Sequence, residues 1–288
     1  MRHELRLKVG PVTFRIGSAW PRPLRAMRSL YSDYPDASAE AADYTVRLEP
    51  AKPWRRWLRP SVAIGGDYVL PDAAPLPLAH GPIAAEMAMN LQLALGERRF
   101  LLLHAASVEK EGRAVVITGE SGAGKSTLSA MLGERGWRFL GDEFALLEPE
   151  TGLLHPFPRP ISLKNEAIGA MEAMVPAPRF GPAMEGTPKG RIRHMRPATE
   201  ALARMGEPAR PALILFPRFG HRREIRPVGP AEAFMRLTQA STNYVALGGA
   251  GFDSLTGLVG KCPAMAMDYP DAATAFALID VLWAGLER

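Results

Sequence analysis

The feature that most constrains this chain is the glycine-rich segment Gly119-Glu120-Ser121-Gly122-Ala123-Gly124-Lys125-Ser126. It follows an apolar stretch, Ala114 to Thr118, that predicts a buried strand, and it runs into a segment, Ser126 to Glu134, that predicts a helix. A glycine, four residues and then Gly-Lys-Ser is the phosphate-loop pattern, and this strand and helix context is the one that the pattern requires. The sequence therefore predicts an α/β domain organised around this loop.

Each residue type in the loop has a physical task. Gly119, Gly122 and Gly124 let the backbone curl, so that N–H groups face a phosphate at the positive end of the following helix. Lys125 supplies a charge for the β- and γ-phosphates, and the hydroxyl of Ser126 suits one position on Mg²⁺. We expect ATP and Mg²⁺ as cofactors, although no motif separates ATP from GTP. The other residues expected at the phosphates are Glu120, Ser121, Ala123 and Thr127. A plain glycine-rich turn with a capping serine is the alternative.

Magnesium bound to a nucleotide also needs a carboxylate. Asp142 ends the strand that is predicted directly after the loop helix, from Trp137 to Leu140, and Glu143 follows it. The other apolar strand, Leu213 to Phe216, ends in Pro217-Arg218 and offers no acid. We therefore expect Asp142 to be the metal ligand with Ser126, unless both acids belong to an ordinary solvated turn.

The chain divides by composition into a small strand-rich N-terminal domain, residues 1–78, and a larger α/β domain, residues 79–288. Short alternating apolar runs separated by proline-rich turns fill the first part, and a connector with three prolines, Pro71 to Pro77, closes it. A helix is expected from Pro82 to Gly96, then a hairpin that pairs Phe100–His104 with Ala114–Thr118. Later strands are expected at Pro160–Leu163 and Ala264–Met267, and later helices at Ala231–Gln239 and Ala272–Leu286.

Bulk composition excludes several classes of protein. Cys262 is the single cysteine among 288 residues, which excludes an internal disulfide and a cysteine-based metal site and favours a reducing, cytoplasmic location. Neither an unbroken apolar secretion signal nor a run of about 18 apolar residues occurs, so no membrane span is expected. Residues 175–226 hold eleven Lys or Arg against four Glu. An anionic ligand explains this regional charge as well as nucleic acid would, and no nucleic acid-binding motif accompanies it.

Three features in order resemble the HPr kinase/phosphorylase catalytic domain and its smaller relatives, the HprK-related kinases, of the A type. His104 precedes Gly119 by 15 positions, the loop follows Ile117-Thr118, and Arg135 to Glu143 is similar to the segment with the family's acidic pair. The resemblance covers Phe100 to Lys164. It implies a P-loop kinase core of the HPr kinase/phosphoenolpyruvate carboxykinase type.

The resemblance further implies an ATP-dependent serine kinase that acts on a protein, a peptide or a small molecule. By this likeness Asp142 takes the hydroxyl proton and His104 stands beside it, with Glu143 as the second acid. The pair here is Asp-Glu where HPr kinases have two aspartates, and their downstream glycine-rich stretch is replaced by Pro156 to Asn165. The resemblance therefore does not extend to HPr as the substrate or to the reverse phosphorylase reaction. A histidine at a strand end can also be an ordinary core residue.

Basic residues further along the chain are candidates for phosphate or acceptor contacts. They are Arg159, Lys164, Lys189 and Arg191, the last two in a Pro/Gly-rich stretch, Thr187 to His194, that predicts a mobile loop. An exposed, solvated loop is the alternative. Trp54-Arg55-Arg56-Trp57 mixes aromatic and basic residues, which could stack on bases, grip a peptide or form a plain hairpin surface.

A third class, nucleic-acid binding through residues 175–226, would show a steep loss of affinity with salt and is favoured least, and two functional classes stand ahead of it. One is the kinase, and the other is a regulatory or scaffold protein that binds a nucleotide as a conformational ligand without chemistry. Binding that survives Asp142→Asn without turnover would indicate the second class. The sequence is compatible with a homo-oligomer and does not identify the acceptor.

Overall fold

The computed structural model describes residues 2–286, and these residues form two compact units. The first unit contains residues 2–97, 162–172 and 176–196, and the second contains 98–161, 173–175 and 197–286. The long helix after the proline-rich connector, Gly81–Gly96, packs within the first unit. The first boundary between the two units along the chain therefore lies near residue 97, whereas the sequence predicted a boundary near residue 78. The boundary at 78 and 79 stays a prediction about which segment folds on its own.

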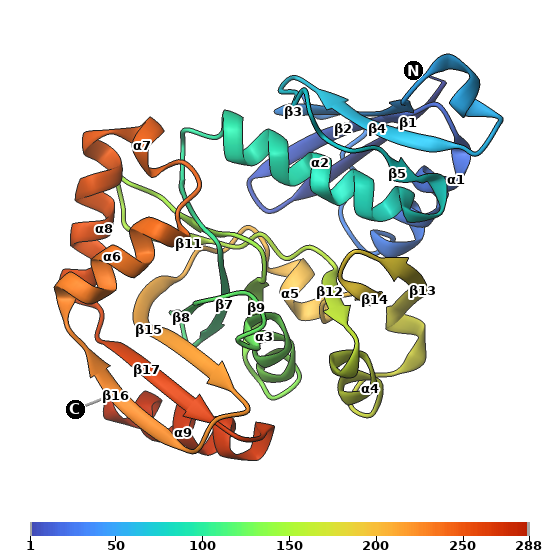
Figure 1. Cartoon of the computed structure of the whole chain (residues 1–288). Helices are drawn as coiled ribbons and strands as arrows, with labels where there is room; N and C mark the ends of the chain where they lie inside the picture. The colour runs from blue at the N-terminus through green and yellow to red at the C-terminus, as the bar shows by residue number, and fades with distance from the viewer. Residues whose placement is uncertain (1, 287–288) are drawn as a thin grey trace. The chain divides into compact units, whose positions relative to one another are not determined.

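The first unit is built on a five-stranded sheet in the order β1-β2-β3-β4-β5. Its strands are β1 (His3–Val9), β2 (Val12–Ser18), β3 (Tyr44–Pro50), β4 (Ser61–Gly66) and β5 (Leu76–Pro77). β2 and β3 are parallel and the other pairs are antiparallel. Two helices complete the unit, α1 (Pro21–Leu30) and α2 (Gly81–Gly96), which are drawn in blue and teal in Figure 1. Within residues 2–97 the chain therefore forms five strands and two α-helices.

Helix α1 is amphipathic. A proline begins it, and Leu24, Met27 and Leu30 bury one face at helical spacing. Its other face carries three exposed arginines, Arg22, Arg25 and Arg28. Helix α2 is apolar on most sides, and it packs against α1, β3 and β4.

A small three-stranded sheet belongs to the same unit. Its order is β12-β14-β13, with β12 (Ile161–Lys164), β13 (Phe180–Thr187) and β14 (Gly190–Met195), and α4 (Glu166–Glu172) follows β12. Residues 187–194, expected as an irregular mobile loop, are therefore the turn and second strand of a hairpin. The prediction was wrong because register shifts and the left-handed Gly186 and Gly190 interrupt the alternating pattern by which strands are read.

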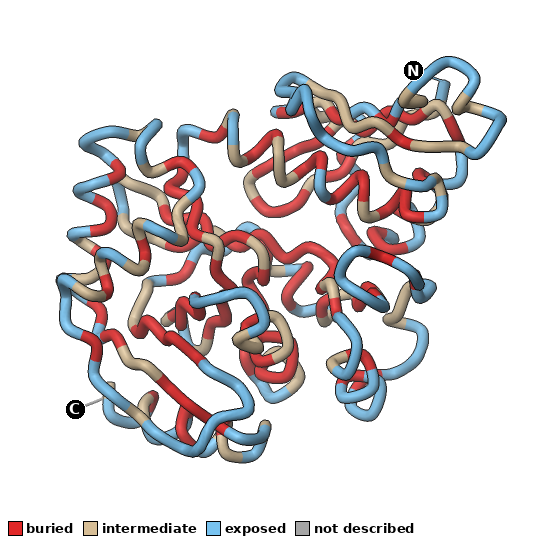
Figure 2. The backbone as a smooth tube through the Cα atoms, viewed as in Figure 1, coloured by how far each residue is buried: buried red, intermediate tan, exposed pale blue. Residues whose placement is uncertain are grey.

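The second unit is built on a six-stranded sheet in the order β16-β17-β15-β8-β7-β9. These strands are β7 (Ala105–Lys110), β8 (Arg113–Thr118), β9 (Arg138–Gly141), β15 (Arg210–Phe219), β16 (Glu224–Val228) and β17 (Ala264–Tyr269). A second, three-stranded sheet holds β6 (Leu101–Leu103), β10 (Ala145–Leu147) and β11 (Leu154–His155). The central strands are buried, whereas β16 at the edge is largely exposed (Figure 2).

The hairpin next to the glycine-rich loop differs from the expected one. β8 pairs with β7, from Ala105↔Thr118 to Lys110↔Arg113, and the two-residue turn Glu111-Gly112 has positive φ at both positions. Such turns match the twist of a hairpin. The expected strand Phe100–His104 is divided, because the chain bends at His104 and β6 joins the other sheet by pairing with β10. No Gly or Pro occurs from Phe100 to Val108, so the sequence carries no turn signal for that bend.

Helices cover both faces of the large sheet. On one face, buried Val116, Ile214 and Phe216 belong to one apolar cluster with α6 (Pro230–Ala240) and α8 (Gly249–Lys261). α3 (Lys125–Gly133) packs against β7, β8 and β9, and α9 (Ala272–Gly285) packs against α3 and β17. Short helices α5 (Thr199–Ala203) and α7 (Tyr244–Leu247) complete the unit (Figure 1). The chain is thus a mixed α/β protein. Among residues 2–286, no helix is both long enough and apolar enough to cross a bilayer.

Strand direction decides which side chains can meet. β8, β15 and β17 are parallel to one another, and β9 shares their direction because β7 runs antiparallel to both β8 and β9. The carboxyl ends of four strands therefore lie at one edge of the sheet, together with the beginning of β7. At this edge of an open α/β sheet, ligands usually bind.

Candidate functional site

The glycine-rich loop leaves the carboxyl end of β8 and enters α3 at Lys125. Gly119, Gly122 and Gly124 have φ of 151°, 87° and 90°, a region that side chains with a Cβ rarely adopt. The glycines are therefore at the positions where the backbone needs them. The loop has the strand–loop–helix form that the sequence predicted.

Lys125 is the first residue of α3 and is 7% exposed. Its Nζ donates to the carbonyl oxygens of Gly119 at 2.7 Å and Glu120 at 2.9 Å, so the ammonium lies across the loop. A cation at the first turn of a helix is unfavourable, since the helix dipole is positive there. A lysine in this position is explained if the site binds an anion whose negative charge offsets both the Lys125 ammonium and the positive end of the helix dipole.

The remaining loop residues are accessible. Glu120 and Ser121 are exposed, and Ala123, Ser126 and Thr127 are half-buried. Ser126 and Thr127 lie in the first turn of α3, where backbone N–H groups have no partner within the helix. An anion can reach this end of the helix.

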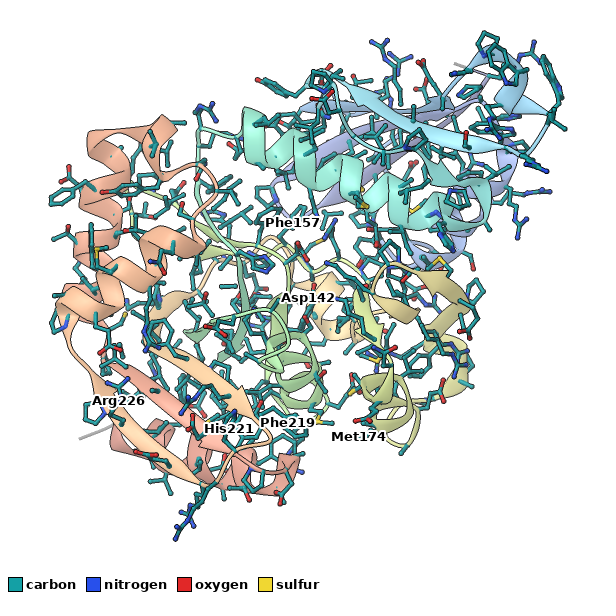
Figure 3. All side chains as sticks on the ribbon, viewed as in Figure 1. Asp142, Phe157, Met174, Phe219, His221 and Arg226 are labelled. Carbon is teal, nitrogen blue, oxygen red and sulfur yellow. The ribbon has the colours of Figure 1, made fainter. Side chains whose placement is uncertain are left out.

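A cavity of about 770 Å³ opens on the loop, and second-unit residues alone line it. The loop contributes Gly119 to Ala123, and the carboxyl end of β15 contributes Phe216 to Phe219. β16, β17 and α6 supply much of the remaining wall, including Arg226, Asp268 and Arg236. In Figure 3, Phe219 lies at the end of β15 with His221 just beyond it, and Arg226 lies on β16. The volume is of the size that holds a nucleotide-sized ligand.

His104 borders this cavity at the bend between β6 and β7. Its side chain is 45% exposed, so it is not an ordinary buried core histidine. Its ring Nδ1 lies 3.1 Å from the carbonyl oxygen of Glu143 and 3.7 Å from that residue's carboxylate. Its backbone carbonyl accepts a hydrogen bond of 3.1 Å from the Thr118 hydroxyl, which ties the bend to the end of β8. The structure therefore brings His104, Glu143 and the start of the loop together.

Asp142 follows β9 at the same edge of the sheet (Figure 3). It is 7% exposed, and the strand register places Gly141 opposite Ser107, which in turn lies opposite Val116 of β8. Asp142 and Glu143 are not among the residues that line the cavity. Both acids follow a strand at this edge but form no part of the cavity wall; Asp142 is buried, whereas the Glu143 side chain is 37% exposed.

An acidic residue that the sequence prediction missed does line the cavity. Asp268, on β17, is 5% exposed and accepts two hydrogen bonds from the guanidinium of Arg218 on β15, including one of 2.8 Å from Nε. These bonds hold the pKa of the Asp268 carboxyl below its usual range and raise the pKa of Arg218. The strand at 264–267 was predicted, and an acid just beyond its end was the signal that could have indicated Asp268.

The other predicted basic contacts are elsewhere. Arg159 is 5% exposed, lies over the Phe157 ring and does not line the cavity. Lys164, Lys189 and Arg191 belong to the first unit, where Arg191 pairs with Glu185 at 2.9 Å. None of these four residues lines the cavity, and their role at a ligand stays a prediction.

The donors at the loop fit Mg²⁺ bound to a nucleotide better than a metal held by protein alone. Residues 2–286 contain no group of three His, Cys, Asp or Glu side chains placed to hold an ion. Mg²⁺ commonly takes one or two protein oxygens and completes its shell with phosphates and water. The Ser126 hydroxyl, with a carboxylate from Asp142 or Asp268, is such a set.

Comparison with known proteins gave one kind of match. No protein-family model matches the sequence, and no curated protein is similar to it in sequence. Among solved structures, the chain is similar to the Hpr(Ser) kinase/phosphatase from Coxiella burnetii, with 15% sequence identity and a TM-score of 0.30. The match covers 65% of this chain and 99% of that chain. The assignment of a reaction therefore rests on the site itself.

Proposed function

We propose that the second unit binds Mg·ATP through the loop Gly119–Ser126 and transfers the γ-phosphoryl group to a serine hydroxyl. The acceptor is a protein, a peptide or a small molecule. In this proposal the unit is a P-loop kinase core of the HPr kinase type, as the resemblance of residues 100–164 implies, and it acts in a reducing compartment such as the cytoplasm.

One observation carries the nucleotide part of this proposal. Lys125 is buried at the positive end of α3, and its ammonium is held against two loop carbonyls beside a cavity of about 770 Å³. A polyphosphate can place its negative charge beside this ammonium and the helix start, and curled backbone amides supply the donors for its oxygens. A glycine-rich turn that binds no ligand would not explain why Lys125 occupies the first position of α3.

The transfer part rests on the side chains at the sheet edge. Asp142 is proposed to orient the acceptor hydroxyl and take its proton, since a serine hydroxyl is a weak nucleophile that needs a carboxylate within hydrogen-bond reach. His104, fixed by its contacts with Glu143 and Thr118, is proposed to stand beside it. Mg²⁺, when bound with the nucleotide, neutralises charge on the phosphate oxygens, and Ser126 with Asp142 would hold it.

A second function is favoured by a different observation. Asp142 is almost fully buried and does not line the cavity. A carboxylate that contacts the γ-phosphate in this conformation would be expected to line it. A regulatory protein that binds ATP as a conformational ligand would need no carboxylate there. The two functions differ in turnover and not in nucleotide affinity.

Labelled ATP separates them. Full-length protein with Mg²⁺ and γ-labelled ATP should label an acceptor in a cell extract, and mass spectrometry should find phosphoserine or a phosphorylated small molecule. We expect Lys125→Met to remove ATP binding by calorimetry, and Asp142→Asn to keep binding and lose transfer at least about a hundredfold. Binding without labelling by the unaltered protein would establish the regulatory function. No binding of Mg·ATP or Mg·GTP by folded protein would refute both.

A further inference from the structure

The first unit carries a surface that the proposed kinase site does not use. We call it the Trp/Arg surface, and it consists of the segment Lys52–Arg59, between β3 and β4, with Arg22 at the start of α1. Trp54, Trp57 and Leu58 are 55%, 75% and 66% exposed. Three large apolar side chains so exposed within five residues are unusual for a surface that faces only water.

The segment is a built feature of the fold. Trp20, 8% exposed, lies beneath it and donates from Nε1 to the carbonyl of Arg56 at 2.9 Å, while Arg56 donates to the carbonyl of Ala19 at 3.2 Å. Pro53 begins a short 3₁₀ helix, Pro53–Arg56, in the same segment. This anchoring fixes the backbone from below and leaves Trp54 and Trp57 directed away from the core.

The charge of this surface has one sign. Lys52, Arg55, Arg56 and Arg59 are its cations, and no Asp or Glu occurs from Pro50 to Gly66, although Glu49 and Asp67 flank that range. Helix α1, held next to it through Trp20 and Ala19, adds three exposed arginines and also contains no acid. Arg22 and Arg59 line the same hollow of about 530 Å³. The surface is therefore complementary to a partner with many negative charges.

Ring geometry decides among anionic partners. The Nζ of Lys52 lies 5.4 Å from the Trp54 ring centroid, and the guanidinium of Arg56 lies 5.5 Å from that of Trp57. The protein's own cations thus cover an indole face that a nucleic acid base would need for stacking. The aliphatic Leu58 side chain has neither a ring to stack on a base nor a polar atom to read one. Exposed indoles and an aliphatic side chain, each beside a cation, suit the interface of a bilayer, where rings lie at headgroup depth and cations contact phosphates.

We propose that the Trp/Arg surface binds the headgroup region of an anionic lipid bilayer, so that the protein associates peripherally with a membrane. Trp54, Trp57 and Leu58 enter the interface, and Lys52, Arg55, Arg59 and Arg22 pair with lipid phosphates and carboxylates. The first unit alone carries this function, so it stands or falls separately from the kinase proposal.

Vesicle binding tests it with the full-length chain. We expect co-sedimentation with vesicles that contain about one third phosphatidylserine and at least about tenfold weaker binding to phosphatidylcholine alone, with the difference reduced at high salt. Brominated lipids should quench tryptophan fluorescence. Trp57→Ser combined with Leu58→Ser, and Arg55→Glu combined with Arg59→Glu, should each lower binding at least about tenfold without a change in melting temperature.

Matched changes elsewhere provide the control. Val245, 89% exposed, and Lys261, also exposed, lie in the second unit, and Val245→Ser with Lys261→Glu should leave vesicle binding unchanged. Equal binding to both vesicle types, or binding that the two surface variants retain, would refute the proposal. It would be replaced if a single-stranded oligonucleotide displaced the vesicles from this surface, or if the variants abolished a dimer of the chain.

Discussion

The hydroxyl of Tyr269 occupies the space beside Gly124, where a Cβ on Gly124 would lie 2.8 Å from that oxygen and 3.3 Å from the Cβ of Phe219. Tyr269 ends β17 and Phe219 ends β15, and the two residues are register partners in the sheet. The end of the sheet therefore packs directly against the last glycine of the loop. Gly124 is needed both for its φ of 90° and for this close contact.

Gly124→Ala should therefore be more damaging than Gly122→Ala. Gly122 has a similar φ of 87°, but a Cβ there would meet nothing within 4 Å. We expect the Gly122 change to cost about 1–2 kcal/mol of backbone strain and the Gly124 change to cost more, with at least tenfold weaker Mg·ATP binding. Urea unfolding and calorimetry measure the two effects.

Removing the Tyr269 hydroxyl should relieve part of the loss of stability that Gly124→Ala causes. We expect Tyr269→Phe to restore some of the stability that Gly124→Ala loses, which would appear as a coupling energy of about 0.5–2 kcal/mol in a double-mutant cycle. Additive effects of the two changes would show that the contact has no energetic weight.

The pair formed by Arg218 and Asp268 predicts a dependence of stability on acidity. The pKa of Asp268 is lowered in the fold, so its contribution is present above the unfolded value of about 3.9 and is lost as pH falls through the lower folded value. Asp268→Asn should lower the free energy of unfolding by a constant amount above about pH 5. Below about pH 4 the difference in free energy of unfolding between the unaltered protein and the Asp268→Asn variant should become smaller. Urea titrations across this pH range measure it. A difference in unfolding free energy that does not depend on pH would show that the charge of the Asp268 carboxylate does not contribute to stability.

Local sequence signals were sufficient for the loop and its flanking elements. The strand ending at Thr118 and the helix after Gly124 are where apolar pattern and glycine spacing indicated. Asp142 also follows a strand, as expected. These features depend on neighbours in the chain, which is why one sequence could indicate them.

Features that depend on distant pairing were not predictable in this way. Asp268 reaches the cavity because β17 pairs with β15 and β15 pairs with β8, and the partners in these pairings, such as Ile214 with Ala264 and Arg210 with Arg113, lie far apart in the chain. The division of β6 from β7 depends on which sheet each strand joins. Lys189 and Arg191 were expected in a loop from composition, whereas they lie in the turn and second strand of a hairpin whose two strands pair with each other.

A buried ion pair away from the cavity should dominate the stability of the second unit. The side chains of Glu109 and Arg138 are each 3% exposed, with 2.5 Å between Oε2 and Nε, and Arg138 also donates to the carbonyls of Arg204 at 2.7 Å and Glu207 at 2.9 Å. Arg138→Met should cost about 3–5 kcal/mol, because it leaves a buried carboxylate and two carbonyls without this donor. Urea unfolding measures it.

Glu200 provides the matched control for that measurement. Its ion pair with Arg204 is an exposed helical pair, with the Glu200 side chain 72% exposed, so Glu200→Ala should cost less than about 0.5 kcal/mol. Similar costs for the two changes would mean that the Glu109–Arg138 pair is not shielded from water.

The single cysteine should report on the opening of the second unit. Cys262 follows α8 and is 5% exposed, and burial raises the pKa of its thiol to about 11. At pH 8 only about one molecule in a thousand would then carry the reactive thiolate. We expect a maleimide or disulfide reagent to modify native protein far more slowly than protein in urea, which should gain one adduct at the rate of an ordinary thiol. Labelling should follow the unfolding curve as urea rises. Complete modification of the folded protein within seconds would contradict the buried position and the raised pKa together.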